Sequence, residues 1–383
     1  MAGGKNHLRR LWLESIVIAA SALLLRLWRL GEPRELVFDE YYYAPAAYSY
    51  IQNLTDPNWV QPPLGKELIA LGIMLLGYNS LGWRLMCAVA GGLTIVLVYW
   101  LGWLVFRSRF IAFASAFMLT FEPLHFIHSR TALLDIFLTL FIVAGFTVYV
   151  KYLRSEGLRW LLLSSLMFSL AVAVKWPALA CIVAAIIIPL AGGSRRRLWR
   201  HIIIFLLLPP VVYLLSYTPL FIGGMTLDYW WLLHREALMF HMFHLANATH
   251  PYASPPWMWL LPFQTLPYYL DASGAEITAT LNPIILWIGV PSAVILLVNA
   301  FGWNPVVLSI PAGFLILYLP WFLSPRMTFL YYMLPTQPFL VVSAAWLIEA
   351  LWIDGRLYRA IALLALASIV GVFVIYYPSL TAL

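Results

Sequence analysis

The sequence predicts an all-α integral membrane protein, a polytopic helical bundle of about eleven transmembrane helices with two long outer loops. Hydrophobic residues make up 63% of the 383 residues and charged residues only 10%, whereas charged residues reach about a quarter of a typical soluble domain. Apolar blocks of membrane-spanning length recur along the chain, and a backbone inside lipid satisfies its polar groups as a helix. Lipid is therefore the predicted solvent for most of this chain.

Apolar blocks separated by polar breaks define the predicted spans. They cover residues 11–30, 84–106, 110–124, 131–152, 160–175, 177–191, 200–221, 282–301, 304–322, 328–350 and 357–377. The blocks 160–175 and 177–191 could also form one long helix broken at Lys175-Trp176-Pro177. Fusing them would place the basic run 195–197 on the outer side, against the positive-inside bias, so we predict two crossings.

The loop charges predict the orientation of the bundle. Most basic clusters fall on the side of the N-terminus, which is therefore predicted to be cytoplasmic. The C-terminus and the long connections 31–83 and 222–281 then lie outside, and they carry most of the carboxylates. Both connections are rich in Tyr and Trp, a composition typical of segments in the membrane interface. We expect residues 1–383 to form one domain with its chemistry at the outer face and no separate soluble domain.

The first candidate for chemistry is the adjacent carboxylate pair Asp39 and Glu40, just beyond the outer end of the first span. A carboxylate at headgroup depth can act on a lipid-borne substrate. Transfer of a sugar from a phosphate needs a base for the attacking hydroxyl and little acid assistance, because phosphate is already a good leaving group. Asp39 is the predicted base, and a solvated loop pair without a catalytic role is the alternative.

The second candidate is a set of cations at the predicted outer ends of spans, where a charge is costly and tends to be functional. Such cations could neutralise a phosphate leaving group. Structural alternatives are snorkelling for Lys175 and pairing with Asp135 for Arg130. The set comprises Lys66, Arg84, Arg130, Lys175 and Arg326.

No metal site and no certain cofactor is predicted, and the need for a divalent cation stays open. The second long connection contains His234, His241, His244 and His250, but only His241 and His244 have helical ligand spacing and no accompanying metal motif is present. Hydrogen bonding in the interface is the favoured interpretation. The net charge of +7 is dispersed between apolar blocks, so nucleic acid is not an expected partner.

Five segments in order resemble motifs of the protein O-mannosyltransferase family, the lipid-phosphate-mannose-dependent enzymes of the membrane-embedded GT-C class. The resemblance covers most of the chain and extends to the span count and the loop pattern. The segments are Phe38-Asp39-Glu40-Tyr41, Gln61-Pro62-Pro63-Leu64-Gly65-Lys66, Arg130-Thr131-Ala132-Leu133-Leu134-Asp135, Ala173-Val174-Lys175-Trp176 and Thr249-His250-Pro251-Tyr252-Ala253-Ser254.

This resemblance implies an inverting mannosyltransferase in a prokaryotic-type plasma membrane, which takes mannose or another hexose from a polyprenyl or dolichyl phosphate. Asp39 would be the catalytic base, and Glu40 would help to position the acceptor or the sugar. The donor phosphate would be held by Arg130 and Lys175, with Lys66 and Arg326 as further phosphate ligands. The expected substrate-positioning residues are Gln61, Asp135, His250 and Tyr252.

Two departures from the family pattern bear on the acceptor and the site. Gln61 stands where the family usually has His, so it can hydrogen-bond but cannot act as a protonated group. The connection 222–281 is too short for the β-trefoil domain of eukaryotic members. The expected acceptor is the Ser or Thr hydroxyl of exported proteins, and the same donor with a glycolipid acceptor is the alternative.

A transporter or flippase is a further alternative, from another functional class. The position of the ionisable residues, at outer ends and not at mid-membrane, disfavours it. The expected partners are therefore a polyprenyl-phosphate sugar, an acceptor polypeptide or glycolipid, and membrane lipids. An oligomer is also possible.

Overall fold

Eleven helices match the predicted spans in a computed structural model that describes residues 2–191, 198–246, 248–261, 264–300, 304–353 and 355–383. The predicted basic run 195–197 lies outside these residues. The matching helices are α1 (Ala2–Leu27), α4 (Ser80–Phe106), α5 (Arg109–Thr120), α7 (Leu134–Ser155), α8 (Leu158–Val174), α9 (Leu179–Ala191), α10 (Leu198–Ser216), α13 (Pro283–Ala300), α14 (Pro305–Tyr318), α15 (Gln337–Ile353) and α16 (Arg356–Thr381).

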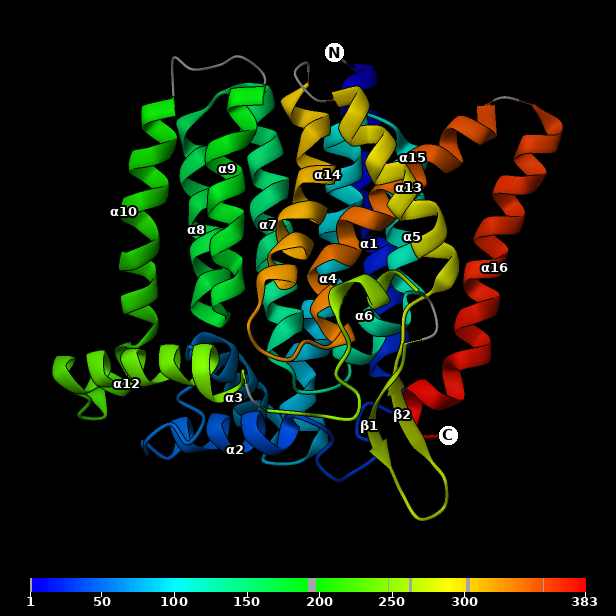
Figure 1. Cartoon of the computed structure of the whole chain (residues 1–383). Coiled ribbons are helices and arrows are strands. Elements are labelled where there is room, and N and C mark those ends of the chain that lie inside the picture. The colour runs from blue at the N-terminus through cyan, green and yellow to red at the C-terminus, as the bar shows by residue number, and fades with distance from the viewer. Residues whose placement is uncertain (1, 192–197, 247, 262–263, 301–303, 354) are drawn as a thin grey trace.

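Seven helical segments in the described part of the chain are long and apolar enough to cross a membrane, and three shorter apolar helices accompany them. The total of eleven crossings therefore stays a prediction. Within the bundle, the α7 segment is 72% buried, whereas the α16 segment is only 17% buried. The core thus surrounds α7, and α16 stands at the periphery (Figure 1).

The expected break between two adjacent spans is confirmed. α8 ends at Val174, a short 3-10 turn η1 (Trp176–Ala178) follows, and α9 begins at Leu179. Pro177 lies in this turn, where its missing N–H does no harm to helix hydrogen bonding. The two helices run side by side in Figure 1, and their connection lies at the end of the bundle that carries the long connections.

Both long connections are folded against the same end of the bundle, opposite the N-terminus (Figure 1). The first forms α2 (Glu40–Ile51) and α3 (Leu64–Leu76), and the second forms α12 (Leu227–Met239) and a π-helical turn η2 (Phe240–His244). The C-terminus also lies at this end. Three short helices complete this part of the fold, namely α6 (Pro123–His128), α11 (Thr218–Ile222) and η3 (Pro256–Leu260).

The second connection also contains an antiparallel hairpin, β1 (Leu266–Leu270) and β2 (Glu276–Ala279), which the sequence interpretation did not anticipate. Its turn is built by the Asp271 carboxylate, which accepts hydrogen bonds from the backbone N–H groups of Ser273 and Ala275. Gly274 supplies a positive φ of 88°, which glycine adopts without a steric penalty. The fold is therefore helical with one small hairpin.

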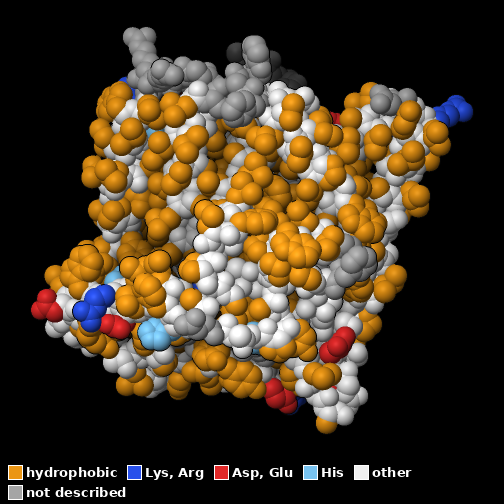
Figure 2. Space-filling view, in the orientation of Figure 1, with side chains coloured by type: hydrophobic (Ala, Val, Ile, Leu, Met, Phe, Trp, Pro, Cys, Tyr) orange, Lys and Arg blue, Asp and Glu red, His pale blue; other side chains and the backbone are white. Residues whose placement is uncertain are grey.

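The surface of the molecule agrees with this arrangement. Apolar side chains cover the sides of the helices, and the charged side chains visible on this face lie toward the two ends (Figure 2). Exposed Leu, Ile and Val side chains are abundant on peripheral helices such as α10 and α16. This distribution is typical of a protein whose helix faces contact lipid.

Glycines allow the close approach of α3 to α4. A Cβ atom on Gly72 would overlap the carbonyl oxygen of Gly82, and a Cβ atom on Gly82 would overlap the carbonyl oxygen of Gly77. Backbone atoms cannot rotate away as a side chain can. α3 is consequently fixed against α4 at the outer end of the bundle.

We expect Gly72→Ala to destabilise the protein by about 1–3 kcal/mol, because the added methyl group overpacks this contact. Gly371→Ala in α16 is the matched control, since nothing lies within 4 Å of its Cβ position and alanine favours helices more than glycine does. The melting temperatures of both variants in detergent test this. Equal melting temperatures would contradict the packing argument.

Candidate active site

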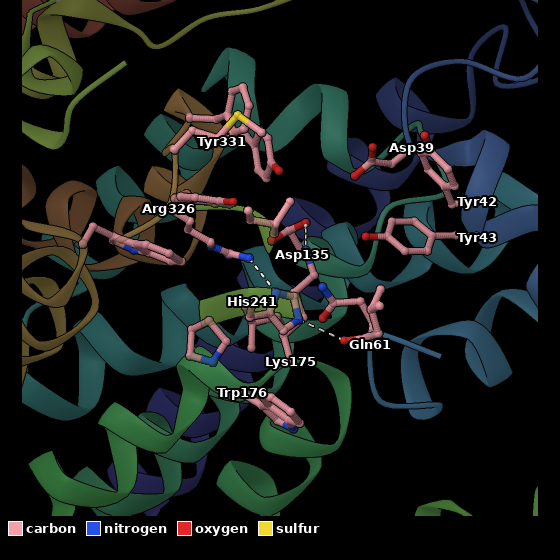
Figure 3. A pocket seen from close by; sticks show the side chains of 18 of the residues that line it. Asp39, Tyr42, Tyr43, Gln61, Asp135, Lys175, Trp176, His241, Arg326 and Tyr331 are labelled. Atoms are coloured by element: carbon pink, nitrogen blue, oxygen red, sulfur yellow. Dashed lines mark hydrogen bonds and ion pairs between the residues drawn. The ribbon is translucent and has the colours of Figure 1, made fainter. Parts of the chain in front are cut away.

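A cavity of about 730 Å³ opens at the end of the bundle opposite the N-terminus, between the two long connections. Its lining includes Asp39, Gln61, Asp135, Lys175 and Arg326, which arrive from five different segments. In Figure 3 the side chains of Asp39, Asp135, Lys175 and Arg326 point toward a common space. The folded chain thus brings together most of the polar residues singled out in the sequence.

Asp39 immediately precedes α2 and follows a residue with an unusual backbone conformation. Phe38 has a φ of 47°, in the left-handed region that costs a non-glycine residue roughly 1–3 kcal/mol. The backbone carbonyl of Asp39 accepts hydrogen bonds from the N–H groups of Tyr42 and Tyr43 in the first turn of α2. The Asp39 side chain remains directed into the cavity.

The surroundings of Asp39 suit a base that works near neutral pH. Burial, together with the nearby charge of Asp135, raises the pKa of its carboxyl to about 6. Lys175 and the Tyr43 hydroxyl oppose this rise in pKa because they stabilise the carboxylate form. A carboxylate with such a pKa is ionised at pH 7 and accepts a proton more readily than an exposed Asp.

Lys175 is paired with Asp135 across the cavity wall. Its Nζ lies 2.7 Å from Asp135 Oδ2, and both side chains are largely buried. Lys175 directly follows α8, and Asp135 lies in the first turn of α7, where the positive end of the helix dipole favours a carboxylate. The alternative that Arg130 pairs with Asp135 does not hold, since Lys175 takes that place.

Both Lys175 and Arg326 line this cavity. Lys175 is paired with Asp135, whereas Arg326 has no carboxylate within 4.0 Å among the described residues. Its Nη1 lies 2.8 Å from His241 Nδ1, and its guanidinium lies over the rings of Trp321 and Tyr332. His241 Nε2 lies 3.0 Å from the carbonyl oxygen of Val60. Because that carbonyl only accepts, Nε2 carries the proton and Nδ1 accepts from Arg326.

This arrangement keeps His241 neutral. Burial lowers the pKa of His241, and the charge of Arg326 lowers it further. The imidazole therefore orients the guanidinium without adding a second positive charge. The sequence interpretation assigned His241 only a role in interface hydrogen bonding, because no local pattern linked it to a distant Arg326.

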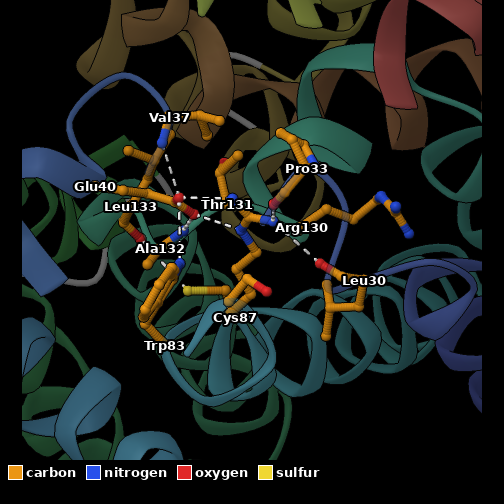
Figure 4. Close-up of polar contacts among 12 residues, drawn as sticks. Leu30, Pro33, Val37, Glu40, Trp83, Cys87, Arg130, Thr131, Ala132 and Leu133 are labelled. Atoms are coloured by element: carbon orange, nitrogen blue, oxygen red, sulfur yellow. Dashed lines mark hydrogen bonds and ion pairs between the residues drawn. The ribbon is translucent and has the colours of Figure 1, made fainter. Parts of the chain in front are cut away.

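Glu40 points away from the cavity and organises the backbone around Asp39 (Figure 4). It is fully buried and accepts two hydrogen bonds of 2.8 Å from the Arg84 guanidinium. It also accepts hydrogen bonds from the backbone N–H groups of Val37 and Ala132 and from the indole N–H of Trp83. With these partners Glu40 fixes the loop, so the expected contact with acceptor or sugar is replaced by a structural role.

Arg130 also lies outside the cavity lining. Its guanidinium donates to the carbonyl oxygens of Arg26, Trp28 and Arg29 and lies over the Phe126 ring. The last carbonyls of a helix lack partners within the helix, and Arg130 binds one of them in α1 and two in the turn that follows. The expectation that Arg130 holds the donor phosphate is therefore revised, because its buried guanidinium is directed at these carbonyls and not at the cavity.

Lys66 is likewise fully buried and outside the lining. It pairs with Asp56 and donates to the carbonyl oxygens of Asn58 and Gln61, at 2.6 and 2.8 Å. These bonds hold the segment that presents Gln61 at the cavity. Lys66 thus supports the backbone of a cavity-lining segment and does not make the expected contact with phosphate.

The remaining predicted residues divide between the cavity and the surface. His250 lines the cavity, whereas Tyr252 is exposed and lies outside the lining. The aromatic residues Tyr43 and Tyr331 line it as well, although no sequence motif distinguished them from other interface aromatics. Among the described residues, no three His, Cys, Asp or Glu side chains are grouped so that they could hold a metal ion.

One side of the cavity is lined by η1, which is hydrogen-bonded to α10 and α12. The Trp176 indole donates to the Tyr213 hydroxyl at 2.9 Å, and this hydroxyl lies 2.8 Å from His234 Nε2 on α12. Trp176 separates the main cavity from a second hollow along α12, of about 670 Å³, which Trp231, Leu232 and Leu238 also line. The polar cavity and this more apolar hollow therefore share one side chain.

Comparisons with known proteins agree with this arrangement. A family model described as dolichyl-phosphate-mannose-protein mannosyltransferase matches residues 16–83 and 79–242. A polyprenol-phosphate-mannose–protein mannosyltransferase of Mycolicibacterium smegmatis is 28% identical in an alignment that covers 87% of this chain and 81% of that protein.

Two solved structures share the fold. The S. cerevisiae protein O-mannosyltransferase Pmt1-Pmt2 complex bound to the sugar donor aligns with a TM-score of 0.85 and 14% identity, covering 97% of this chain and 90% of that chain. ArnT from Cupriavidus metallidurans bound to undecaprenyl phosphate aligns with a TM-score of 0.65 and 18% identity, covering 96% and 65%. The helical GT-C type bundle that the sequence predicted is thereby confirmed, with the addition of the small hairpin.

We expect Arg84→Met to destabilise the protein by about 3–5 kcal/mol, because it leaves the buried Glu40 carboxylate without its cation. Arg34→Met, in the loop between α1 and α2 that Glu40 fixes, is the matched control. Its ion pair with Glu32 is exposed, and such pairs contribute about 0–1 kcal/mol. Thermal unfolding in detergent measures both, and a similar shift for the two variants would rule out the buried pair as the anchor of the loop.

Proposed function

Since this chain belongs to the dolichyl-phosphate-mannose-protein mannosyltransferase family, we propose that it moves mannose from a polyprenyl phosphate to Ser or Thr hydroxyls of exported proteins. The observation that carries the proposal is the cavity in which the Asp39 carboxylate faces the cations Arg326 and Lys175. The named activity of the Mycolicibacterium relative supports the donor and the acceptor class. Asp39 is assigned as the base.

The proposed reaction is a single displacement at C1 of the mannosyl group. The acceptor oxygen forms a bond to C1 while the bond from C1 to the phosphate oxygen breaks and its electron pair leaves with polyprenyl phosphate. Asp39 takes the proton of the attacking hydroxyl. Attack and departure on opposite faces invert the configuration, so a β-linked donor gives an α-linked product.

Arg326 is the proposed main ligand of the donor phosphate. Negative charge grows on the phosphate as the sugar departs, and a cation without a carboxylate partner stabilises that charge most. Lys175 is the second ligand, with its charge partly balanced by Asp135. His241 holds the guanidinium in place, and Gln61 and His250 are assigned to positioning of the sugar or the acceptor.

The hollow along α12 is the proposed course of the prenyl chain. It adjoins the phosphate cavity at Trp176 and is lined mainly by apolar side chains. A lipid could therefore place its phosphate beside Lys175 while its chain remains at the membrane surface. We further propose that this end of the bundle faces the extracytoplasmic side of a prokaryotic plasma membrane, consistent with the basic clusters near the N-terminus.

We expect Asp39→Asn to lower the rate of mannose transfer about 100- to 10,000-fold, because the amide cannot accept the proton. Purified protein with labelled polyprenyl-phosphate mannose and a Ser/Thr-containing peptide tests this. A lipid extract as acceptor forms the second arm. Transfer to lipid alone would reject the protein acceptor, flux of donor without transfer would favour a flippase, and full activity of the variant would reject the assigned base.

The same assay gives a pH profile for the wild-type protein. A base acts only when ionised, and the pKa of Asp39 is raised to about 6. The rate should therefore be constant above this value and fall about tenfold per pH unit below it. A rate independent of pH between 5 and 8 would contradict the assignment of Asp39 as base.

We expect Arg326→Gln to raise the KM for the donor about 10- to 100-fold, the effect of one lost charge-assisted hydrogen bond. Arg130→Gln is the matched comparison. Because Arg130 caps α1 outside the cavity, it should lower the melting temperature and leave the donor KM of the folded protein nearly unchanged. A raised donor KM in Arg130→Gln, with an unchanged donor KM in Arg326→Gln, would instead assign the donor phosphate to Arg130.

A further inference from the structure

The hairpin of the second connection contacts the residue that precedes Asp39. The rings of Tyr268 in β1 and Phe38 are stacked, with centroids 4.0 Å apart and an interplanar angle of 4°. The Phe38 N–H donates to the Tyr268 carbonyl oxygen at 3.2 Å. Two different parts of Tyr268 therefore hold both the ring and the backbone of Phe38.

Tyr268 is itself fixed from the other side. It is buried, and its hydroxyl lies 2.8 Å from His128 Nε2 at the end of α6. This hydrogen bond ties the ring to the bundle, so Tyr268 connects α6 to the loop before α2. The Tyr331 ring approaches Phe38 edge-on at 5.8 Å, and Phe38 is thus enclosed by aromatic residues from two distant segments.

The backbone of Phe38 needs such support. A non-glycine residue with a φ of 47° persists only where its surroundings determine the conformation. A relaxed φ would turn the following peptide and redirect the Asp39 side chain. The burial of Glu40 fixes the position after Asp39, but no contact of Glu40 reaches the ring of Phe38.

We propose that Tyr268 is a positioning residue for Asp39, which holds Phe38 in its left-handed conformation and so directs the carboxylate into the cavity. The inference rests on the proposed function, since it gives the second long connection a part in the same transfer reaction. Tyr268 acts through Phe38 and has no contact with substrate in this role. Its loss should therefore affect the chemical step and spare the binding of the donor.

We expect Tyr268→Leu to lower kcat about 10- to 100-fold, the effect of a small misplacement of a reacting group, with the donor KM unchanged. Tyr268→Phe keeps the ring and the backbone contact, and should recover most of the rate. Tyr269→Leu at the next position of the strand, where the side chain is only partly buried, is the control and should retain wild-type kcat. Purified full-length variants are compared with polyprenyl-phosphate mannose and an acceptor peptide.

The pH profile separates positioning from a general loss of stability. A redirected Asp39 would be more exposed to water and would lose most of the desolvation that raises its pKa, which outweighs the effects of Lys175, Asp135 and Tyr43, so the midpoint for Tyr268→Leu should fall below that of the wild type. Partial unfolding would lower the amount of active protein without moving the midpoint. A decrease in kcat with an unchanged midpoint would therefore overturn the proposal.

A double-variant cycle provides a second test. Phe38→Gly removes the stacked ring and accepts a positive φ without strain. In that background Tyr268→Leu should cause little further loss of kcat, whereas independent roles would give multiplicative losses. Failure of the wild type to transfer mannose would reject the proposed function, but transfer by the wild type with full kcat in Tyr268→Leu would reject only this inference.

Discussion

The cavity end of this protein depends on the buried ion pair between Glu40 and Arg84. Two charges removed from solvent are tolerable only when their hydrogen-bonding capacity is satisfied. Here the carboxylate receives five hydrogen bonds, and Arg84 also donates to the carbonyls of Leu30, Pro33 and Glu35. The pair thus joins the end of α1, the start of α2, α4 and the segment before α7. Asp39, next to Glu40 in the chain, is free to face the cavity because Glu40 performs this task.

The cations at this end of the bundle fall into two groups with different chemistry. Arg84, Arg130 and Lys66 direct their donors at backbone carbonyls that a membrane protein must satisfy internally. Arg326 and Lys175 keep donors at the cavity, supported by a neutral imidazole and a carboxylate. Whether one of these cations can bind a ligand thus depends on whether nearby backbone carbonyls already accept its hydrogen bonds, and not on its depth in the membrane.

This division explains how far the sequence could predict the site. Span positions and the break at Pro177 followed from local hydrophobicity and from proline chemistry, which neighbouring residues determine. The resemblance selected Asp39, Lys175 and Gln61, all of which line the cavity. It could not distinguish Arg130 from Arg326, because the partners of each come from distant segments. Similarly, nothing near Tyr268 in the sequence indicates its contact with Phe38.

The glycine contact between α3 and α4 gives the two sides of the cavity different mechanical stiffness. On the first side, backbone rests directly against backbone, and the buried Lys66 holds the loop that carries Gln61. On the second side, η1 lines the cavity and is joined to α10 and α12 through side-chain hydrogen bonds of Trp176, Tyr213 and His234, which can exchange partners at low cost. Compliance toward a bulky lipid and a polypeptide therefore resides on the side of η1.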